Sequence, residues 1–363
     1  MLTGKKRPDK IMTAKEAVSH YVHDGDTISE ANFITGAPFA LIHEIIRQHK
    51  KDLTYVNQSG LDEIEVLIAG GCLRRVMTAF VARPPGIKES QLEGAMRSGK
   101  VEMEEYSNYS LLSMLEAGAK GNSCAIVLPS LIHSDIFNKR RFAGEQKFKV
   151  SKCPFSGNDL LLVPALRPNV SILHAQRADR SGNVQYWGAN GNTKWAAMAA
   201  DKIIVSVEEI VDNLEIRESR EYTIIPNFMV DAVIHEPWGA HPMELCGYYS
   251  FDFPFRSRMV FSMSKGTDGV EKWLDSWVYG VASRREYLEK YKEVFGADAL
   301  ARFRVPLKFS GTVKDGGQTH GHFDENDYGK IIGLKFDVFN QLAEAVNSGA
   351  GDEELEKILL GVD

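Results

Sequence analysis

Residues 27–60 read TISEANFITGAPFALIHEIIRQHKKDLTYVNQSG, and this stretch predicts the fold. A short apolar run at 27–33 predicts a strand, helical spacing of apolar residues at 39–48 predicts a helix, and 53–57 predicts a second strand. Two strands joined by a helix are typical of a parallel pair, because parallel neighbours need a crossover connection. The stretch therefore predicts an α/β fold with a mainly parallel sheet.

The same alternation continues on both sides of this stretch. Upstream, 14–21 has the pattern of an amphipathic helix, with Thr13 as its candidate N-cap. Downstream, strands are predicted at 75–80, 159–163, 170–175, 202–207 and 229–235, and helices at 64–69, 110–119, 192–200, 269–278 and 284–295. The segment 243–255 is rich in aromatic residues, glycine and proline, so it is predicted to be a loop. Strands that alternate with helices predict one mostly parallel sheet covered by helices.

Composition excludes several classes of protein. The chain has 363 residues, of which 44% are hydrophobic and 25% charged, which is typical of a globular protein with a large core. Its formal net charge of -6 argues against binding to nucleic acid. The N-terminal residues lack the apolar region of a signal peptide, and no run is long enough for a membrane span, so a cytoplasmic protein is expected. The scattered cysteines predict reduced thiols; they are Cys72, Cys124, Cys153 and Cys246.

Several motifs together resemble the α subunits of the class I CoA-transferase family, of the glutaconate CoA-transferase type. The motifs that carry the resemblance are His174-Ala175-Gln176, Val207-Glu208-Glu209-Ile210, Val230-Asp231-Ala232-Val233 and Pro237-Trp238-Gly239-Ala240-His241-Pro242. Their common order extends the resemblance over about residues 10–295, which we interpret as one domain, and leaves 296–363 as a partly helical C-terminal extension. The resemblance implies a three-layer α/β/α sandwich around a mainly parallel sheet.

The resemblance also implies a function. Family members move coenzyme A between an acyl-CoA and an organic acid, and the glutamate that forms the thioester with CoA lies in the β half of the enzyme. No copy of that motif is found in this chain, so a separate β subunit is predicted as its partner. The CoA thioester would then be a substrate, and no permanently bound cofactor is expected. Two alternatives stay open, namely a hydrolase or lyase that cleaves a carbon–carbon bond of a CoA thioester, and a non-catalytic ligand-binding subunit.

The predicted substrate-binding residues lie in loops that follow strands. In a parallel sheet such loops meet at one edge, so the loops at 30–36, 57–60 and 80–86 are the candidate walls of the acyl pocket. Family members carry a Gly-Gly-Phe turn after the first strand, whereas this chain has Ala31, Asn32 and Phe33 there. The candidates are Glu30, Asn32 and Phe33, with Ser59 from the next loop and His241 from the motif at 237–242.

Each of these candidates has a structural alternative. Glu30 is either a base or nucleophile, or a strand-end glutamate that faces solvent or forms an ion pair. Asn32 either donates to a substrate oxygen or stabilises the local turn. His241 is either a general acid or base, or a hydrogen-bonding side chain that holds its loop in place.

An acidic cluster of Glu102, Glu104 and Glu105 is the last candidate with a catalytic interpretation. Such a cluster is typical of the first turn of a helix, where carboxylates are favoured by the helix dipole. A branch of the family that the chain resembles consists of steroid ring-opening hydrolases that use a glutamate from this region, which makes Glu105 the catalytic candidate in the hydrolase interpretation. The polar residues His320, His322, Asp324 and Asp327 match no strong metal-binding spacing and are interpreted as a loop, so no metal site is predicted.

Overall fold

A computed structural model of the chain describes residues 9–33, 35–82, 87 and 89–305, and isolated positions at 341, 344–345, 348–351, 354 and 357–358. Most of the C-terminal extension that is predicted to be partly helical lies outside the described residues, and the polar residues from His320 to Asp327 lie entirely outside them. None of the helices in the described ranges combines the length and the hydropathy that a bilayer span requires.

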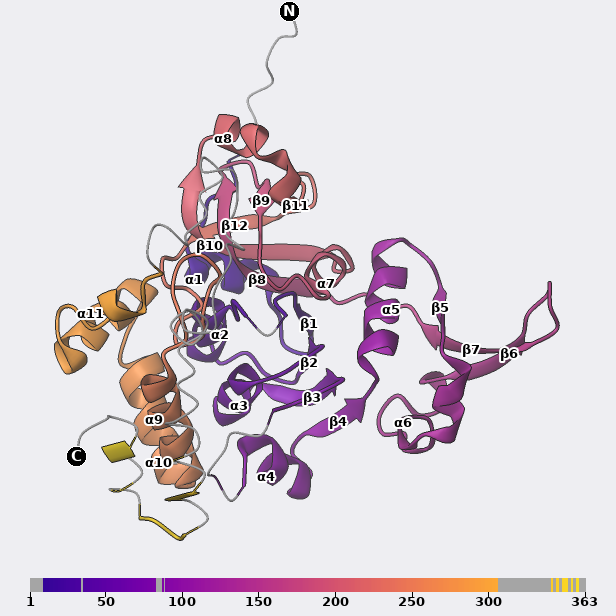
Figure 1. The fold of residues 1–363 in the computed structure, drawn as a ribbon, viewed down its shortest axis with the longest axis horizontal. Coiled ribbons are helices and arrows are strands. Elements are labelled where there is room, and N and C mark those ends of the chain that lie inside the picture. The colour runs from indigo at the N-terminus through magenta and orange to yellow at the C-terminus, as the bar shows by residue number, and fades with distance from the viewer. Residues whose placement is uncertain are drawn as a thin grey trace, which may run out of the picture.

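One large sheet forms the centre of the molecule (Figure 1). Its parallel strands are, in spatial order, β12 (Ala232–His235), β10 (Lys202–Val211), β8 (Val170–Asp179), β1 (Thr27–Glu30), β2 (Leu53–Asn57), β3 (Leu73–Thr78) and β4 (Glu102–Glu105). The end of β8 also pairs with an antiparallel ribbon made of β9 (Val184–Gln185) and β11 (Thr223–Ile225). The mainly parallel sheet that the sequence predicts is confirmed.

Helices cover both faces of this sheet, which gives three layers. The alternation of side chains along β2 shows how the two cores arise, because Tyr55 packs into one core and its neighbour Val56 into the other. The core that contains Tyr55 is formed with α1 (Ala14–Tyr21), α2 (Phe39–Arg47), α3 (Asp62–Ala69), α4 (Gln91–Arg97), α9 (Phe253–Ser264), α10 (Thr267–Leu274) and α11 (Arg284–Phe295). The opposite core is formed with α5 (Asn108–Ala119) and α7 (Thr193–Met198).

Two helix predictions show how local signals place helix ends. Helix α1 begins where the sequence predicts, because the Thr13 side chain accepts the backbone N–H of Glu16 and the Glu16 carboxylate bonds back to Thr13 in a capping box. Helix α11 also has the predicted bounds. The predicted loop at 243–255 is wrong at its end, because Asp252 accepts the N–H of Phe255 and starts α9 there.

A small lobe beyond β4 was not predicted. It contains a separate antiparallel sheet in the order β5 (Cys124–Val127), β7 (Asp159–Pro164) and β6 (Lys149–Lys152), and α6 (Asp135–Asn138). The lobe projects from the side of α5 in Figure 1. The strand at 159–163 is therefore real, but it belongs to this lobe and not to the main sheet. Its alternating exposure, with Leu161 and Val163 buried, is the pattern of a strand with one covered face.

The acidic segment at 102–105 is a strand and not the first turn of a helix. Glu102 to Glu105 form β4, which pairs in parallel with β3. The following helix starts only at Asn108, because Ser107 and Ser110 cap each other's backbone N–H groups. The strand register brings Glu105 beside Thr78 at the edge of the sheet.

Candidate functional site

The carboxyl ends of four neighbouring strands meet at one edge of the sheet. Strands β1, β2, β3 and β4 end at Glu30, Asn57, Thr78 and Glu105, and the register pairs Asn57 with Thr78 and Thr78 with Glu105. Ligands of open α/β sheets bind beyond this edge, where the loops after the strands converge. The structure thus places Glu30, Ser59 and Glu105, three residues that the sequence singles out, at the same edge, with β2 and β3 between Glu30 and Glu105.

Glu30 is enclosed at this edge, so the prediction that it faces solvent or forms an ion pair is wrong. Only 2% of its surface is exposed, and within the described residues it has no ion pair. Its Oε2 accepts the Tyr55 hydroxyl at 2.7 Å and also the side-chain amide of Asn57. Both partners come from β2, the neighbouring strand, so the carboxyl group is held by the sheet itself.

Asn57 connects Glu30 with a second buried carboxyl group, that of Glu63 at the start of α3. The same Asn57 Nδ2 that donates to Glu30 also donates to Glu63 Oε1 at 3.0 Å. The Asn57 Oδ1 accepts the N–H of Ser59 at 2.8 Å, and Glu63 Oε1 accepts the N–H of Leu61 at 2.6 Å. The loop between β2 and α3 is therefore tied down by side chains at both of its ends.

Burial changes the acidity of both carboxyl groups. It raises the pKa of Glu30 to about 7, although the hydrogen bonds from Tyr55 and Asn57 oppose the shift. It also raises the pKa of Glu63 well above its ordinary value, and the nearby charge of Glu30 adds to the effect. Glu63 Oε2 is buried without a hydrogen-bond partner in the described part of the chain, so no donor on that oxygen stabilises a negative charge.

Asn32 and Phe33 lie in the loop after β1 and contact neighbouring segments of the chain. The Asn32 amide donates to the carbonyl of His174 at 2.9 Å and accepts the N–H of His174 at 2.8 Å, so it continues the pairing with β8 beyond the strand end. Phe33 packs against Gly191, where a Cβ would lie 2.2 Å from the Phe33 ring. The local structural role that was one of two interpretations of Asn32 is thus present.

Ser59 lies in the short loop that the carboxyl groups hold. Its neighbour Gln58 is buried, donates from Nε2 to the carbonyl of Asn108 at 3.1 Å, and keeps Oε1 unbonded within the described residues. Gly60 allows a close approach, since a Cβ there would lie 2.3 Å from Ile64, and its backbone pairs with Phe80 and Ala82 of the loop after β3. The loops at 57–60 and 80–82 are thus adjacent, while 83–86 lie outside the described residues.

Glu104 and Glu105 differ completely in environment, because successive strand residues point to opposite faces. Glu104 is fully buried, 2.6 Å from the ammonium group of Lys147, and accepts the backbone N–H groups of Arg141 and Ala143. It anchors the lobe to the sheet. Glu105 is exposed at the carboxyl end of β4. Of the two glutamates, Glu105 is the one that can contact a ligand.

His241 lies away from the strand edge, in the core beneath α9 and α11. It is fully buried, with Nε2 2.9 Å from Asp252 Oδ2 and Nδ1 2.8 Å from the Tyr287 hydroxyl. Burial lowers its pKa, although Asp252 opposes the shift. Both ring nitrogens are occupied, as the structural interpretation of this residue requires. His174 is bonded in the same way by Ser206 and Glu208.

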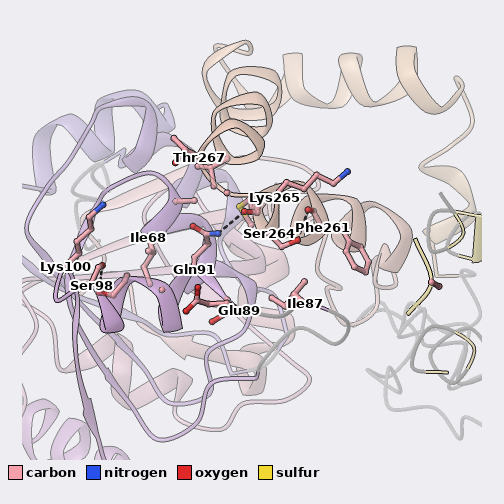
Figure 2. A pocket seen from close by; sticks show the side chains of 18 of the residues that line it. Ile68, Ile87, Glu89, Gln91, Ser98, Lys100, Phe261, Ser264, Lys265 and Thr267 are labelled. Carbon is pink, nitrogen blue, oxygen red and sulfur yellow. Dashed lines mark hydrogen bonds between the residues drawn. The ribbon is translucent and has the colours of Figure 1, made fainter. Parts of the chain in front are cut away.

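A cavity of about 1010 Å³ lies elsewhere, between α4 and the α9–α10 pair, and shares no residue with the strand edge. Figure 2 shows its lining, with Gln91 bonded across it to the carbonyl of Met263 at 3.0 Å. The cavity separates helices of the outer layer and touches the loop after β3 only at its far end, at Ile87, Glu89 and Ser90 next to α4. Across the described ranges, no three His, Cys, Asp or Glu side chains are grouped so as to hold a metal ion.

Sequence reasoning missed the residues that hold the site together. Tyr55, Asn57 and Glu63 look like ordinary parts of a strand and a helix. A signal existed for Asn57, since it is a strongly polar residue at the last position of a mostly buried strand. No comparable signal marked Glu63, because an acidic residue in the first turn of a helix is common.

Comparisons with known proteins agree on one family. The family model of coenzyme A transferase matches residues 11–236. The A-type subunit of the 3-oxoadipate CoA-transferase of Pseudomonas knackmussii is 34% identical over 293 residues, which are 78% of this chain and 99% of that protein. The crystal structure of glutaconate coenzyme A-transferase from Acidaminococcus fermentans superposes with a TM-score of 0.73 at 31% identity, covering 82% of this chain and 96% of that one. A cholesterol ring-cleaving hydrolase IpdA subunit of Mycobacterium tuberculosis is 30% identical over 284 residues, 75% of this chain and 94% of that protein.

Proposed function

Because the chain belongs to the coenzyme A transferase family, we propose that it is the α-type subunit of a cytoplasmic enzyme that moves CoA from an acyl-CoA to an organic acid. A separate β subunit of the same family supplies the glutamate that carries CoA as a thioester. The α subunit supplies one wall of the acyl pocket from the loops after β1, β2 and β3. The CoA thioester is a substrate, and the complex needs no permanently bound cofactor.

The burial of Glu30 is the observation that supports a nucleophile from the partner subunit. A carboxylate nucleophile needs an accessible oxygen, whereas Glu30 is 2% exposed and engaged by Tyr55 and Asn57. At the same edge the loop after β2 carries the Ser59 hydroxyl, a group that can donate to a carboxylate or thioester oxygen, whereas the amide of Gln58 already donates to Asn108. An edge with polar binding groups and an enclosed Glu30 fits a subunit whose nucleophile comes from a partner.

Co-expression with a β-type subunit tests this proposal directly. The purified complex is incubated with succinyl-CoA, with and without 3-oxoadipate or glutaconate as the acceptor acid. We expect CoA to move to the acceptor and no CoA ester to be consumed without it. Ping-pong kinetics and a trappable thioester on the partner subunit would support the same assignment. Release of free CoA without any acceptor would contradict it.

A second candidate function is a hydrolase or lyase that cleaves a carbon–carbon bond of a CoA thioester. The exposure of Glu105 at the same strand edge favours it, because an accessible carboxylate there can serve as a general acid or base. The relative named as a ring-cleaving hydrolase also matches most of this chain.

The variant Glu105→Gln distinguishes the two functions. In the transferase, the nucleophile belongs to the partner, so we expect the variant complex to keep its CoA-transfer rate within about threefold of the wild type. In the hydrolase, loss of the acid or base would lower turnover by roughly 10²–10⁴-fold. Both are measured as kcat on the assembled complex, with Glu102→Gln as the matched control, because Glu102 is exposed on the same strand at the far end.

A further inference from the structure

Two buried carboxyl groups share one amide donor at the edge of the sheet. Asn57 Nδ2 donates to Glu30 and to Glu63, which places the two carboxyl groups within about 6 Å of each other. The neighbouring Asp62 is paired with Arg256 through two hydrogen bonds of 2.5 and 2.7 Å, so that guanidinium group is already neutralised. In the described residues no other cation pairs with either glutamate.

The same three residues hold the loop that follows β2. Asn57 accepts the N–H of Ser59, and Glu63 accepts the N–H of Leu61. Two backbone donors of the loop are therefore bonded to the cluster of Glu30, Asn57 and Glu63. Tyr55, which donates to Glu30 from within the strand, completes the connection between the sheet and the loop. A change in the charge of the cluster therefore acts on the position of Gln58 and Ser59.

We propose that Glu30, Asn57 and Glu63 are positioning residues that hold the loop at 58–61 against the acyl site, and that they do so only while the two carboxyl groups carry at most one negative charge. This inference rests on the proposed function for its connection to acyl transfer. The hydrogen bonds and the shared donor are properties of the chain itself. The three residues act through the loop and do not contact the reacting atoms.

Electrostatics gives the reason for the charge limit. Two carboxylates at this separation repel each other strongly, because both side chains are buried and 2% exposed. The groups that face them are Tyr55, which is neutral, Asp62 with Arg256, and Glu65, which bonds to the backbone N–H groups of Gln91 and Leu92. Arg256 is the cation among them, and its single charge is already shared between Asp62, Glu65 and Glu63. Gaining a second negative charge would separate the carboxyl groups and release the bonds to Ser59 and Leu61.

Amide hydrogen exchange on the assembled complex tests the proposal without any turnover. In the wild type, protection of the peptide that covers 58–61, after correction for the intrinsic rate, is expected to fall by roughly tenfold or more between pH 6 and pH 9. In Glu30→Gln and Glu63→Gln the cluster can hold only one charge, so protection should stay constant across the range. Glu63→Gln conserves shape well, because Oε1 keeps both bonds and Oε2 has no partner to lose in the described part of the chain.

Thermal unfolding gives a second readout in the same variants. A carboxyl group whose pKa is raised by folding stabilises the protein below its ordinary pKa of 4.5, and this stabilisation is lost as pH rises toward about 7 for Glu30. The variant Glu30→Gln has no carboxyl group at this position, so it does not show this loss of stability with rising pH. The melting temperature of Glu30→Gln relative to the wild type should therefore increase by on the order of 5 °C between pH 5 and pH 8.

Glu65→Gln is the matched control, because Glu65 is equally buried and bonds to backbone N–H groups of α4 instead of the loop. It should leave exchange at 58–61 with the pH dependence of the wild type. In kinetics, we expect the high-pH decrease of kcat/KM that the second negative charge causes to be absent in Glu30→Gln and Glu63→Gln, and to be kept in Glu65→Gln. Unchanged, pH-dependent exchange at 58–61 in both cluster variants would overturn the proposal. A wild-type complex that transfers no CoA would instead reject only the proposed function, since the exchange result does not depend on it.

Discussion

Replacing Lys147 by methionine is expected to lower the free energy of unfolding by about 3–5 kcal/mol. Lys147 and Glu104 are both fully buried, and the ammonium group lies 2.6 Å from Glu104 Oε1. The same oxygen has no well-aligned hydrogen bond within the described residues, so charge alone balances it. Methionine keeps most of the side-chain volume and removes that balance. The carboxylate would remain with only the backbone N–H groups of Arg141 and Ala143.

Urea denaturation of the purified protein measures this effect, and two further variants identify its cause. Adding Glu104→Gln to Lys147→Met should recover more than half of the loss, because no buried charge is then left unpaired. Lys120→Met breaks an ion pair of the same 2.6 Å length with Glu116, but that pair is exposed to solvent, so it should cost less than about 1 kcal/mol. If the double variant were as unstable as Lys147→Met, lost packing would be the cause.

The second large effect is expected from Asp252→Ala, which should lower the free energy of unfolding by about 3–5 kcal/mol, because several hydrogen bonds to buried donors are lost. Asp252 Oδ2 accepts His241 Nε2 and the hydroxyl of Tyr291, and Oδ1 caps α9 at Phe255. Because a carboxylate can only accept, His241 Nε2 carries the proton of this bond, and burial lowers the pKa of the imidazole. Removing the carboxylate would leave that N–H buried without an acceptor.

The cap and the buried network can be separated by comparison with Ser283→Ala. Ser283 caps α11 through the N–H of Glu286, and among the described residues its hydroxyl has no further buried partner, so its loss should lower the free energy of unfolding by about 1 kcal/mol. Thermal unfolding of both variants gives the difference, which belongs to His241 and Tyr291. Equal losses in the two variants would mean that the capping bond accounts for the whole effect of Asp252.

The sheet edge at which the candidate site lies could be predicted from the sequence, whereas the hydrogen bonds between its residues could not. The alternation around 27–60 predicts parallel strands, and parallel strands bring the loops after β1, β2 and β3 to one edge. That inference needs only local periodicity. The identity of the partners of Glu30 needs distances between segments, because Tyr55 and Asn57 lie 25 and 27 positions further along the chain.

Glu104 and Glu105 illustrate the same limit within four residues. Four consecutive positions with three acidic residues are compatible with the start of a helix or with a strand, and local propensity cannot choose between them. The segment forms a strand because it pairs with β3, and successive side chains of a strand point to opposite faces of the sheet. The lobe that buries Glu104 was itself not predicted, so the ion pair with Lys147 was invisible in the sequence.

The sequence by itself determined the family, the mainly parallel α/β architecture and the edge at which the strands end, because motif order and hydrophobic periodicity are local properties of the chain. Only the tertiary structure decided which polar residues are enclosed and which are accessible. Burial depends on contacts between segments that are distant in sequence. In this protein such contacts enclose Glu30, Glu104 and His241 and leave Glu105 exposed at the surface.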